Sequence, residues 1–162
     1  MYPKDIIERI KLPFRKDKEL YSSFYKILGF YPHHIQYYEQ ALHHKSSSIK
    51  KQGSWINNER LEFLGDSVLS VVVANYLFHH STRPEGELSR MRASLVSEDA
   101  LFQFAQEIDL GSYLRLGRGE ERCGGRTRPS VVSDAFEAVI AALYLDGGME
   151  VARNFILPFI TE

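Results

Sequence analysis

The chain has 162 residues, of which 44% are hydrophobic and 25% charged, and this composition is typical of one globular domain, not of a disordered tail or a fibre. Its 20 basic and 21 acidic residues give a net charge of −1, which excludes a protein coated in positive charge. It has no run of about 18 apolar residues, no signal peptide at its charged N-terminus, and one cysteine, Cys123. We therefore expect a soluble, cytoplasmic protein with no membrane segment and no internal disulfide.

Hydrophobic residues recur at intervals of three and four, and period-two alternation is not sustained, so the pattern predicts an all-α fold. Two long connections are expected, 45–56, rich in Ser and Lys, and 111–130, rich in Gly and Arg. Ser97 is a predicted N-cap, and Gly147 and Gly148 are predicted to end a helix. With no repeat and no linker, residues 1–162 are expected to form one domain. The predicted helices cover about 17–28, 33–44, 57–80, 85–94, 97–109, 131–146 and 149–157.

The predicted helix over 57–80 concentrates negative charge on one face. At about 100° per residue, Glu59, Glu62 and Asp66 fall within a sector of about 60°. Like charges at this spacing repel, and no lysine occupies the matching positions, so we expect a cationic partner from outside the helix. The opposite side carries the residues expected to face the core, Leu61, Leu64, Val68, Val71 and Val72.

A second acidic face is predicted on the helix over 131–146. Asp134 and Glu137 share one side, behind an expected cap at Ser133, and their neighbours are small or apolar. If the two helices cross, four or five carboxylates converge, and such oxygen ligands suit Mg²⁺ or Mn²⁺ in phosphodiester hydrolysis. Solvated acids that stabilise a helix dipole explain Asp134 and Glu59, but they explain Glu62, Asp66 and Glu137 poorly.

A di-iron carboxylate bundle is a rival with similar geometry. It requires Glu-x-x-His on facing helices. The matching spacings here run from Glu59 to Glu62 and from Asp134 to Glu137, with no histidine, which disfavours the rival.

Four ordered segments resemble the ribonuclease III family over about a hundred residues. NNERLEFLGDSVLS at 57–70 resembles the family's signature, and the other three lie at 41–46, 85–97 and 116–148. The resemblance implies an all-helical endonuclease domain that dimerises and cleaves double-stranded RNA with Mg²⁺, for which Mn²⁺ can substitute. It also implies products with 5′-phosphate and 3′-hydroxyl ends and a role in rRNA and mRNA processing.

The resemblance also implies roles for individual residues. Glu62, Asp66, Asp134 and Glu137 would hold the metal, and Glu59 and Glu85 would be supporting catalytic acids near the scissile strand. The catalytic region would cover about 40–148, with 1–30 as an N-terminal helical extension. The N-terminal residues favour a fragment of a longer protein over one of the family's short members. A non-catalytic RNA-binding or ribosome-associated module on the same fold is the alternative function.

Two further features point to macromolecular contacts. Phe63 projects beside the carboxylates, where it either packs under a loop or contacts another protein, and the resemblance favours a plug into the partner of a homodimer. Arginines crowd the second connection, which is either a solvated loop or a surface for RNA phosphates. The candidate RNA-binding residues are Arg115, Arg118, Arg126 and Arg128.

Overall fold

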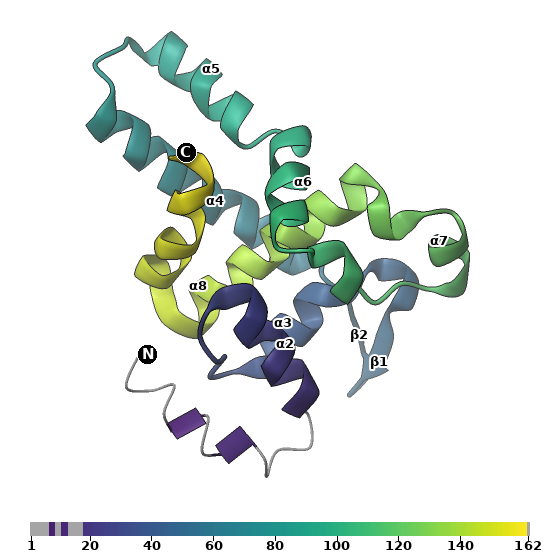
Figure 1. Ribbon diagram of the computed structural model, residues 1–162. Coiled ribbons are helices and arrows are strands. Elements are labelled where there is room, and N and C mark those ends of the chain that lie inside the picture. Colours follow the sequence, from purple (N-terminus) through teal and green to yellow (C-terminus); the bar gives the residue numbers. More distant parts are fainter. Residues whose placement is uncertain (1–6, 9–10, 13–17, 162) are drawn as a thin grey trace.

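The structure is a computed structural model that describes residues 7–8, 11–12 and 18–161 (Figure 1). Over these residues the chain forms helices and one short hairpin, and the expected N-terminal extension at 1–30 lies partly outside them. The principal helices are α2 (Lys18–Leu28), α3 (Ile35–Leu42), α4 (Glu59–His80), α5 (Glu85–Leu95), α6 (Glu98–Glu107), α7 (Arg118–Arg122) and α8 (Pro129–Ile160). The short elements are the 3-10 turns η2 (Lys45–Ser47), η3 (Leu110–Tyr113) and η4 (Gly125–Thr127) and the strands β1 (Ile49–Lys51) and β2 (Ser54–Ile56).

The predicted helical fold is confirmed, with one addition. Strands β1 and β2 pair antiparallel within the segment expected to be an irregular connection. Each strand has three residues, which is too short for period-two alternation to be recognised in the sequence. The other expected connection, 111–130, contains η3, α7 and η4 and is therefore more ordered than its glycine content indicated.

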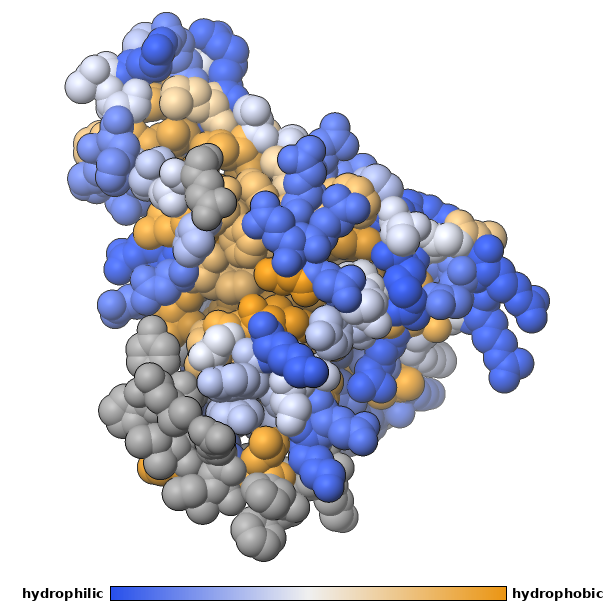
Figure 2. Space-filling view, viewed as in Figure 1, coloured by the Kyte–Doolittle hydropathy of each residue, from blue (hydrophilic) through white to orange (hydrophobic). Residues whose placement is uncertain are grey.

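Helices α4 and α8 form the centre of the molecule and pack against each other along much of their lengths. The first part of α8 is buried on nearly all sides, with Phe136, Ile140 and Leu143 almost fully covered. Figure 2 shows hydrophobic side chains gathered in the middle of one face, around α8, with hydrophilic side chains at the far end of the α4–α5 hairpin and around α7. The core therefore consists of the two helices that carry the predicted acids.

The predicted apolar side of α4 is only partly correct. Leu61, Val68 and Val72 are buried and Leu64 is half-buried, whereas Val71 is 55% exposed. By length and composition alone α4 could span a membrane, but core helices of globular proteins satisfy the same criteria. The packing of α4 against α8 places its buried apolar residues in the core.

Helix α8 begins earlier than predicted and bends where predicted. It starts at Pro129, a residue suited to a first helical turn, so Ser133 lies buried inside the helix and is not its N-cap. Gly148 has a φ of 85°, and this conformation separates the two helical segments expected from the sequence. The N-cap at Ser97 is confirmed, since its side chain accepts a hydrogen bond from the Ala100 amide.

The N-terminal end of α3 is fixed to α8 by Asp146. This carboxylate, whose side chain is 2% exposed, accepts hydrogen bonds from the backbone amides of His33 and His34 and from the hydroxyl of Tyr38. Four bonds to one carboxylate, including that with the His34 ring, hold α3 firmly against the core. The segment after α3 therefore has a fixed position relative to α4 and α8.

Candidate active site

The close approach of α4 and α8 depends on one glycine. A Cβ atom added at Gly65 would lie 1.8 Å from the carbonyl oxygen of Glu137 and 3.3 Å from the amide nitrogen of Ala141. Only glycine leaves room for the two backbones to meet at this point. Because Glu62 and Asp66 lie one turn or less from Gly65, and Glu137 lies on the facing helix, the crossing brings the acidic faces of the two helices together.

Glu62 lies among the other carboxylates of this crossing. Burial, together with the nearby charges of Asp134, Glu59 and Asp66, raises its pKa to about 7. The Glu62 side chain also forms a hydrogen bond with Asp134, and the raised pKa assigns the shared proton to Glu62. Burial also raises the pKa of Asp134, although this hydrogen bond opposes the shift.

Glu137 is the most strongly perturbed acid of the group. Burial, together with repulsion from Asp66, Glu62 and Asp134, raises its pKa to about 8. The shift comes from lost hydration and from three negative neighbours, so among the residues that the structure describes no cation compensates the ionised side chain. The structure thus brings together Glu59, Glu62, Asp66, Asp134 and Glu137, which we call the carboxylate cluster.

The chemistry of the carboxylate cluster fits a hard divalent cation. Carboxylate oxygens are the ligands that Mg²⁺ and Mn²⁺ prefer, and a cation would stabilise the ionised forms of Glu62 and Glu137, which burial and mutual repulsion disfavour. Within the part of the chain that the structure describes, no three His, Cys, Asp or Glu side chains are already arranged to chelate one ion. The acids share one region of the crossing, and their chemistry suits a divalent cation.

Two basic residues, His44 and Lys45, border the carboxylate cluster, and no sequence motif indicated this. The charge of Lys45, and that of His44 when its ring is protonated, act to lower the pKa of Asp134. The Nδ1 atom of His44 accepts a hydrogen bond from the Ser46 amide at 3.1 Å, so the neutral ring carries its proton on Nε2. These residues follow α3, whose position α8 fixes, and no helical pattern in the sequence could have linked them to Asp134.

Two predicted site residues lie apart from the carboxylate cluster or point away from the core. Glu85 begins α5, beyond the end of α4 opposite Glu59, and it accepts a hydrogen bond from the Ser89 hydroxyl. The 22 residues of α4 separate the two acids by about 30 Å. Phe63 is 78% exposed, which excludes its packing under a loop of the same chain.

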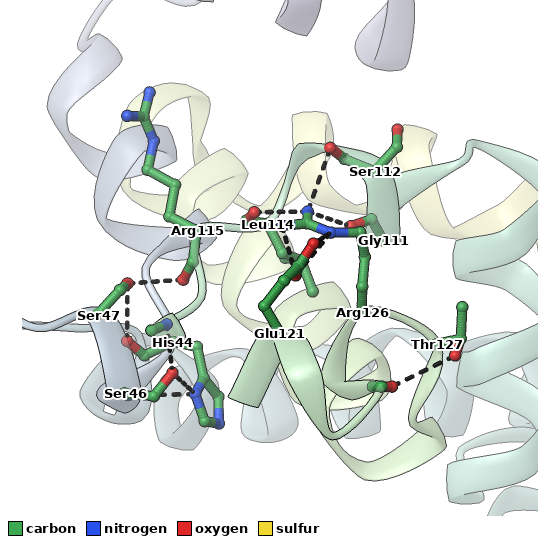
Figure 3. A network of polar contacts seen from close by, with 12 residues as sticks. His44, Ser46, Ser47, Gly111, Ser112, Leu114, Arg115, Glu121, Arg126 and Thr127 are labelled. Carbon is green, nitrogen blue, oxygen red and sulfur yellow. Dashed lines mark hydrogen bonds and ion pairs between the residues drawn. The ribbon is translucent and has the colours of Figure 1, made fainter. Parts of the chain in front are cut away.

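The four predicted RNA-binding arginines fall into two groups: Arg126 and Arg128 are bound within their own loop, and Arg115 and Arg118 are exposed. Arg126 pairs with Glu121 and donates hydrogen bonds to the carbonyl oxygens of Gly111 and Leu114, as Figure 3 shows. Arg128 pairs with Glu120 and donates a hydrogen bond to the carbonyl of Cys123. Both guanidinium groups therefore stabilise the 111–128 loop, which gives them a structural role that the sequence did not indicate.

Arg115 and Arg118 are exposed, and the Arg115 guanidinium in Figure 3 extends away from the surrounding polar contacts. The backbone carbonyl of Arg115 accepts hydrogen bonds from the His44 amide and the Ser47 hydroxyl. These two arginines remain candidates for phosphate contacts, and their loop is fixed to the segment beside the carboxylate cluster.

Comparisons with known proteins agree with this arrangement. A family model described as Ribonuclease-III-like matches residues 35–162. The chain is 47% identical over 155 residues to Ribonuclease 3 of Syntrophomonas wolfei, covering 95% of this chain and 62% of the relative. It is 46% identical over 146 residues to Ribonuclease 3 of Treponema denticola, covering 90% and 59%. The chain thus spans about three-fifths of the length of these curated relatives.

The fold also matches a solved structure, the nuclease domain of ribonuclease III from Campylobacter jejuni, described for flexibility in a region involved in dimer formation. The TM-score is 0.78 at 41% identity, over 85% of this chain and 94% of that one. A second structure of that nuclease domain gives a TM-score of 0.76 at 38% identity, covering 90% and 95%. The matched region contains both helices of the carboxylate cluster, and by sequence and by fold the chain belongs to the ribonuclease-III-like family.

Proposed function

We propose that this chain is the nuclease domain of a double-strand-specific endoribonuclease that hydrolyses RNA phosphodiester bonds and leaves 5′-phosphate and 3′-hydroxyl ends. The observation that carries the proposal is the convergence of acids from α4 and α8 at a helix crossing that only glycine permits. Family membership supports the choice of RNA as substrate. Processing of rRNA and mRNA in the cytoplasm is the cellular role that this activity would serve.

In this proposal Glu62, Asp66, Asp134 and Glu137 hold Mg²⁺, for which Mn²⁺ can substitute, and Glu59 supports them from the first turn of α4. The bound ion supplies positive charge against the phosphodiester and makes water a better nucleophile at neutral pH. Ionised Glu62 and Glu137 would provide the negative charge that retains the ion, and their partial burial strengthens this attraction. Arg115 and Arg118 bind phosphates of the duplex at the side of the carboxylate cluster.

We further propose that the active form is a homodimer that forms through α4. Phe63, Val71 and Phe78 are 78%, 55% and 73% exposed and lie along one side of this helix. Apolar side chains in such a row are typical of a surface covered by another subunit. Because Glu85 lies at the far end of α4 from Glu62, any role of Glu85 at a carboxylate cluster requires a second copy of the chain.

A cleavage assay tests the proposed function. The chain is incubated with duplex RNA, single-stranded RNA and duplex DNA, with Mg²⁺ or with EDTA. The expected result is Mg²⁺-dependent cleavage of duplex RNA alone. Binding of duplex RNA with no cleavage at any Mg²⁺ concentration would contradict the proposal and would identify the chain as a non-catalytic RNA-binding module.

A further inference from the structure

The β1–β2 hairpin is an exposed and basic structure that the proposed catalytic chemistry does not use. Lys50, Lys51 and Trp55 are all exposed, and Trp55 is 67% exposed. Together they form what we call the hairpin surface. The segment 45–56 also contains Lys45 and has no Asp or Glu, so it is purely cationic.

The hairpin presents its side chains in a fixed arrangement. Lys50 lies directly opposite Trp55, so the ammonium group and the indole share one face, while Lys51 lies on the other face. The strands are joined by Gln52 and Gly53, with φ values of 50° and 81°, as a tight two-residue hairpin turn requires. The turn therefore holds Lys50 beside the indole, with Lys51 next to it on the opposite face.

Hydrogen bonds connect the hairpin to the start of α4, where the carboxylate cluster begins. The Asn57 amide group donates to the Ser48 hydroxyl at 3.2 Å, and the Asn57 side-chain oxygen accepts from the Glu59 backbone amide at 3.0 Å. Gln40 donates to the Asn57 carbonyl at 3.1 Å. A strand of RNA bound on the hairpin surface would therefore have a defined position relative to the carboxylate cluster.

The hairpin segment is also joined to the loop that carries the exposed arginines. The Gly117 amide donates to the Ser46 hydroxyl at 2.9 Å, and a Cβ atom at Gly117 would lie 2.4 Å from the Ser46 carbonyl oxygen. The two backbones are in direct contact, so the lysines of the hairpin segment lie near the loop that carries the exposed Arg115 and Arg118. This charge favours a polyanion over a protein partner.

The exposed tryptophan specifies which part of an RNA it can contact. Inside a duplex the faces of the bases are covered by their neighbours, so an aromatic side chain can stack only on an unpaired or terminal base. We propose, on the basis of the proposed function, that the hairpin surface binds unpaired nucleotides adjoining the duplex: Lys50 and Lys51 contact phosphates and Trp55 stacks on an exposed base. The preferred substrates are then duplexes interrupted by a loop or bulge or extended by a single strand.

Trp55 is the only tryptophan of the chain, so its fluorescence reports on this surface directly. Two dye-labelled RNAs are compared in EDTA, a blunt perfect duplex and the same duplex with an internal loop. Anisotropy of the dye measures total binding, and tryptophan emission measures contact at the hairpin. We expect both RNAs to bind, with a much stronger change of Trp55 emission for the looped RNA, because the blunt duplex offers only its two terminal base pairs for stacking.

Variants separate the stacking contribution from the charge contribution. Trp55→Ala should weaken binding of the looped RNA about tenfold and leave the perfect duplex nearly unchanged, while Trp55→Phe should retain most of the affinity. Replacing Lys50 and Lys51 together by Ala should lower the slope of log affinity against log salt by about one to two for the looped RNA. Lys26→Ala, at an exposed lysine of α2, is the matched control and should change neither quantity.

The outcomes distinguish this inference from the proposed function. RNA binding with unchanged Trp55 emission for both RNAs would overturn the role of the hairpin and leave the proposed function intact. No binding of either RNA would overturn both. If Trp55→Ala leaves both RNA affinities unchanged but shifts the monomer–dimer equilibrium in sedimentation, the hairpin surface is a protein contact and the inference is wrong.

Discussion

Glu137 illustrates the opposition between stability and function at a single residue. The unfolded chain ionises its glutamates near pH 4.5, whereas the folded protein holds the pKa of Glu137 near 8 and that of Glu62 near 7. Between these values the folded state binds more protons than the unfolded state, so stability falls as the pH rises. We therefore predict that the metal-free protein loses stability steadily from about pH 4.5 to pH 8, measured by denaturant unfolding in EDTA.

The variant Glu137→Gln removes one source of this pH dependence. It should be more stable than the wild type at pH 8 without metal and differ little from it near pH 5, because a neutral amide has no charge to bury. Glu150→Gln, at an exposed position of the same helix, is the control and should follow the wild type at both pH values. A Glu137→Gln variant less stable than the wild type at pH 8 would show that the ionised Glu137 carboxylate does not destabilise the folded protein.

At the scale of helices, the crossing of α4 and α8 depends on Gly65. Gly65→Ala places a methyl group within 1.8 Å of a backbone oxygen, so the helices must separate. We predict a loss of about 3 kcal/mol of unfolding free energy, together with most of the metal-dependent activity. Gly86→Ala in α5, where a Cβ atom meets nothing within 4 Å, should be neutral or slightly stabilising in the same denaturation experiment.

The loop before α8 gives a second prediction at this scale. Arg126→Ala removes the ion pair with Glu121 and the bonds to the carbonyls of Gly111 and Leu114, so the Leu114 carbonyl loses this donor while the Gly111 carbonyl keeps its bond from the Leu114 amide. We expect faster hydrogen exchange over 111–128 and about 1 kcal/mol of destabilisation. Arg122→Ala, at an exposed position of α7, should leave the exchange unchanged. Equal exchange in both variants would mean that Arg126 does not hold the loop.

Helical periodicity was sufficient to predict α4, α8 and the two acidic faces. At 3.6 residues per turn Glu62, Asp66, Asp134 and Glu137 could be assigned to faces before any contact was known. The close approach could not be predicted, because whether Gly65 is a packing contact or a weak point of a helix depends on the helix that faces it.

Three other features depended on contacts that sequence spacing does not encode. The ion pairs of Arg126 and Arg128 involve Glu121 and Glu120, so a run of arginines that resembles an RNA-binding loop contains two residues that stabilise it. The β1–β2 hairpin was missed because its strands are too short to show a period. Val71 was assigned to the core because hydrophobicity alone does not distinguish a buried side chain from one on an exposed apolar surface.

At the scale of the whole molecule, the exposed apolar row on α4 predicts assembly. Phe63→Glu adds a charge beside the carboxylate cluster and removes a large apolar contact, so the proposed dimer should weaken by about 3 kcal/mol. Sedimentation at several concentrations measures this change, and activity should fall with the dimer. Met149→Glu, at a partly exposed apolar residue beside the kink of α8, is the control and should leave assembly unchanged. An unaltered dimer for Phe63→Glu would exclude this residue from the interface.

The central claim is that the carboxylate cluster is a metal-dependent catalytic site, and the cleavage rate of Glu137→Gln tests it most directly. Single-turnover cleavage of a duplex RNA is measured with Mg²⁺ for wild type and variant, at protein concentrations that saturate binding of the RNA. The amide preserves the shape of the side chain and removes one charged ligand, so we predict a rate at least about a hundredfold lower with duplex binding and fold retained. A variant that cleaves at nearly the wild-type rate would contradict the assignment.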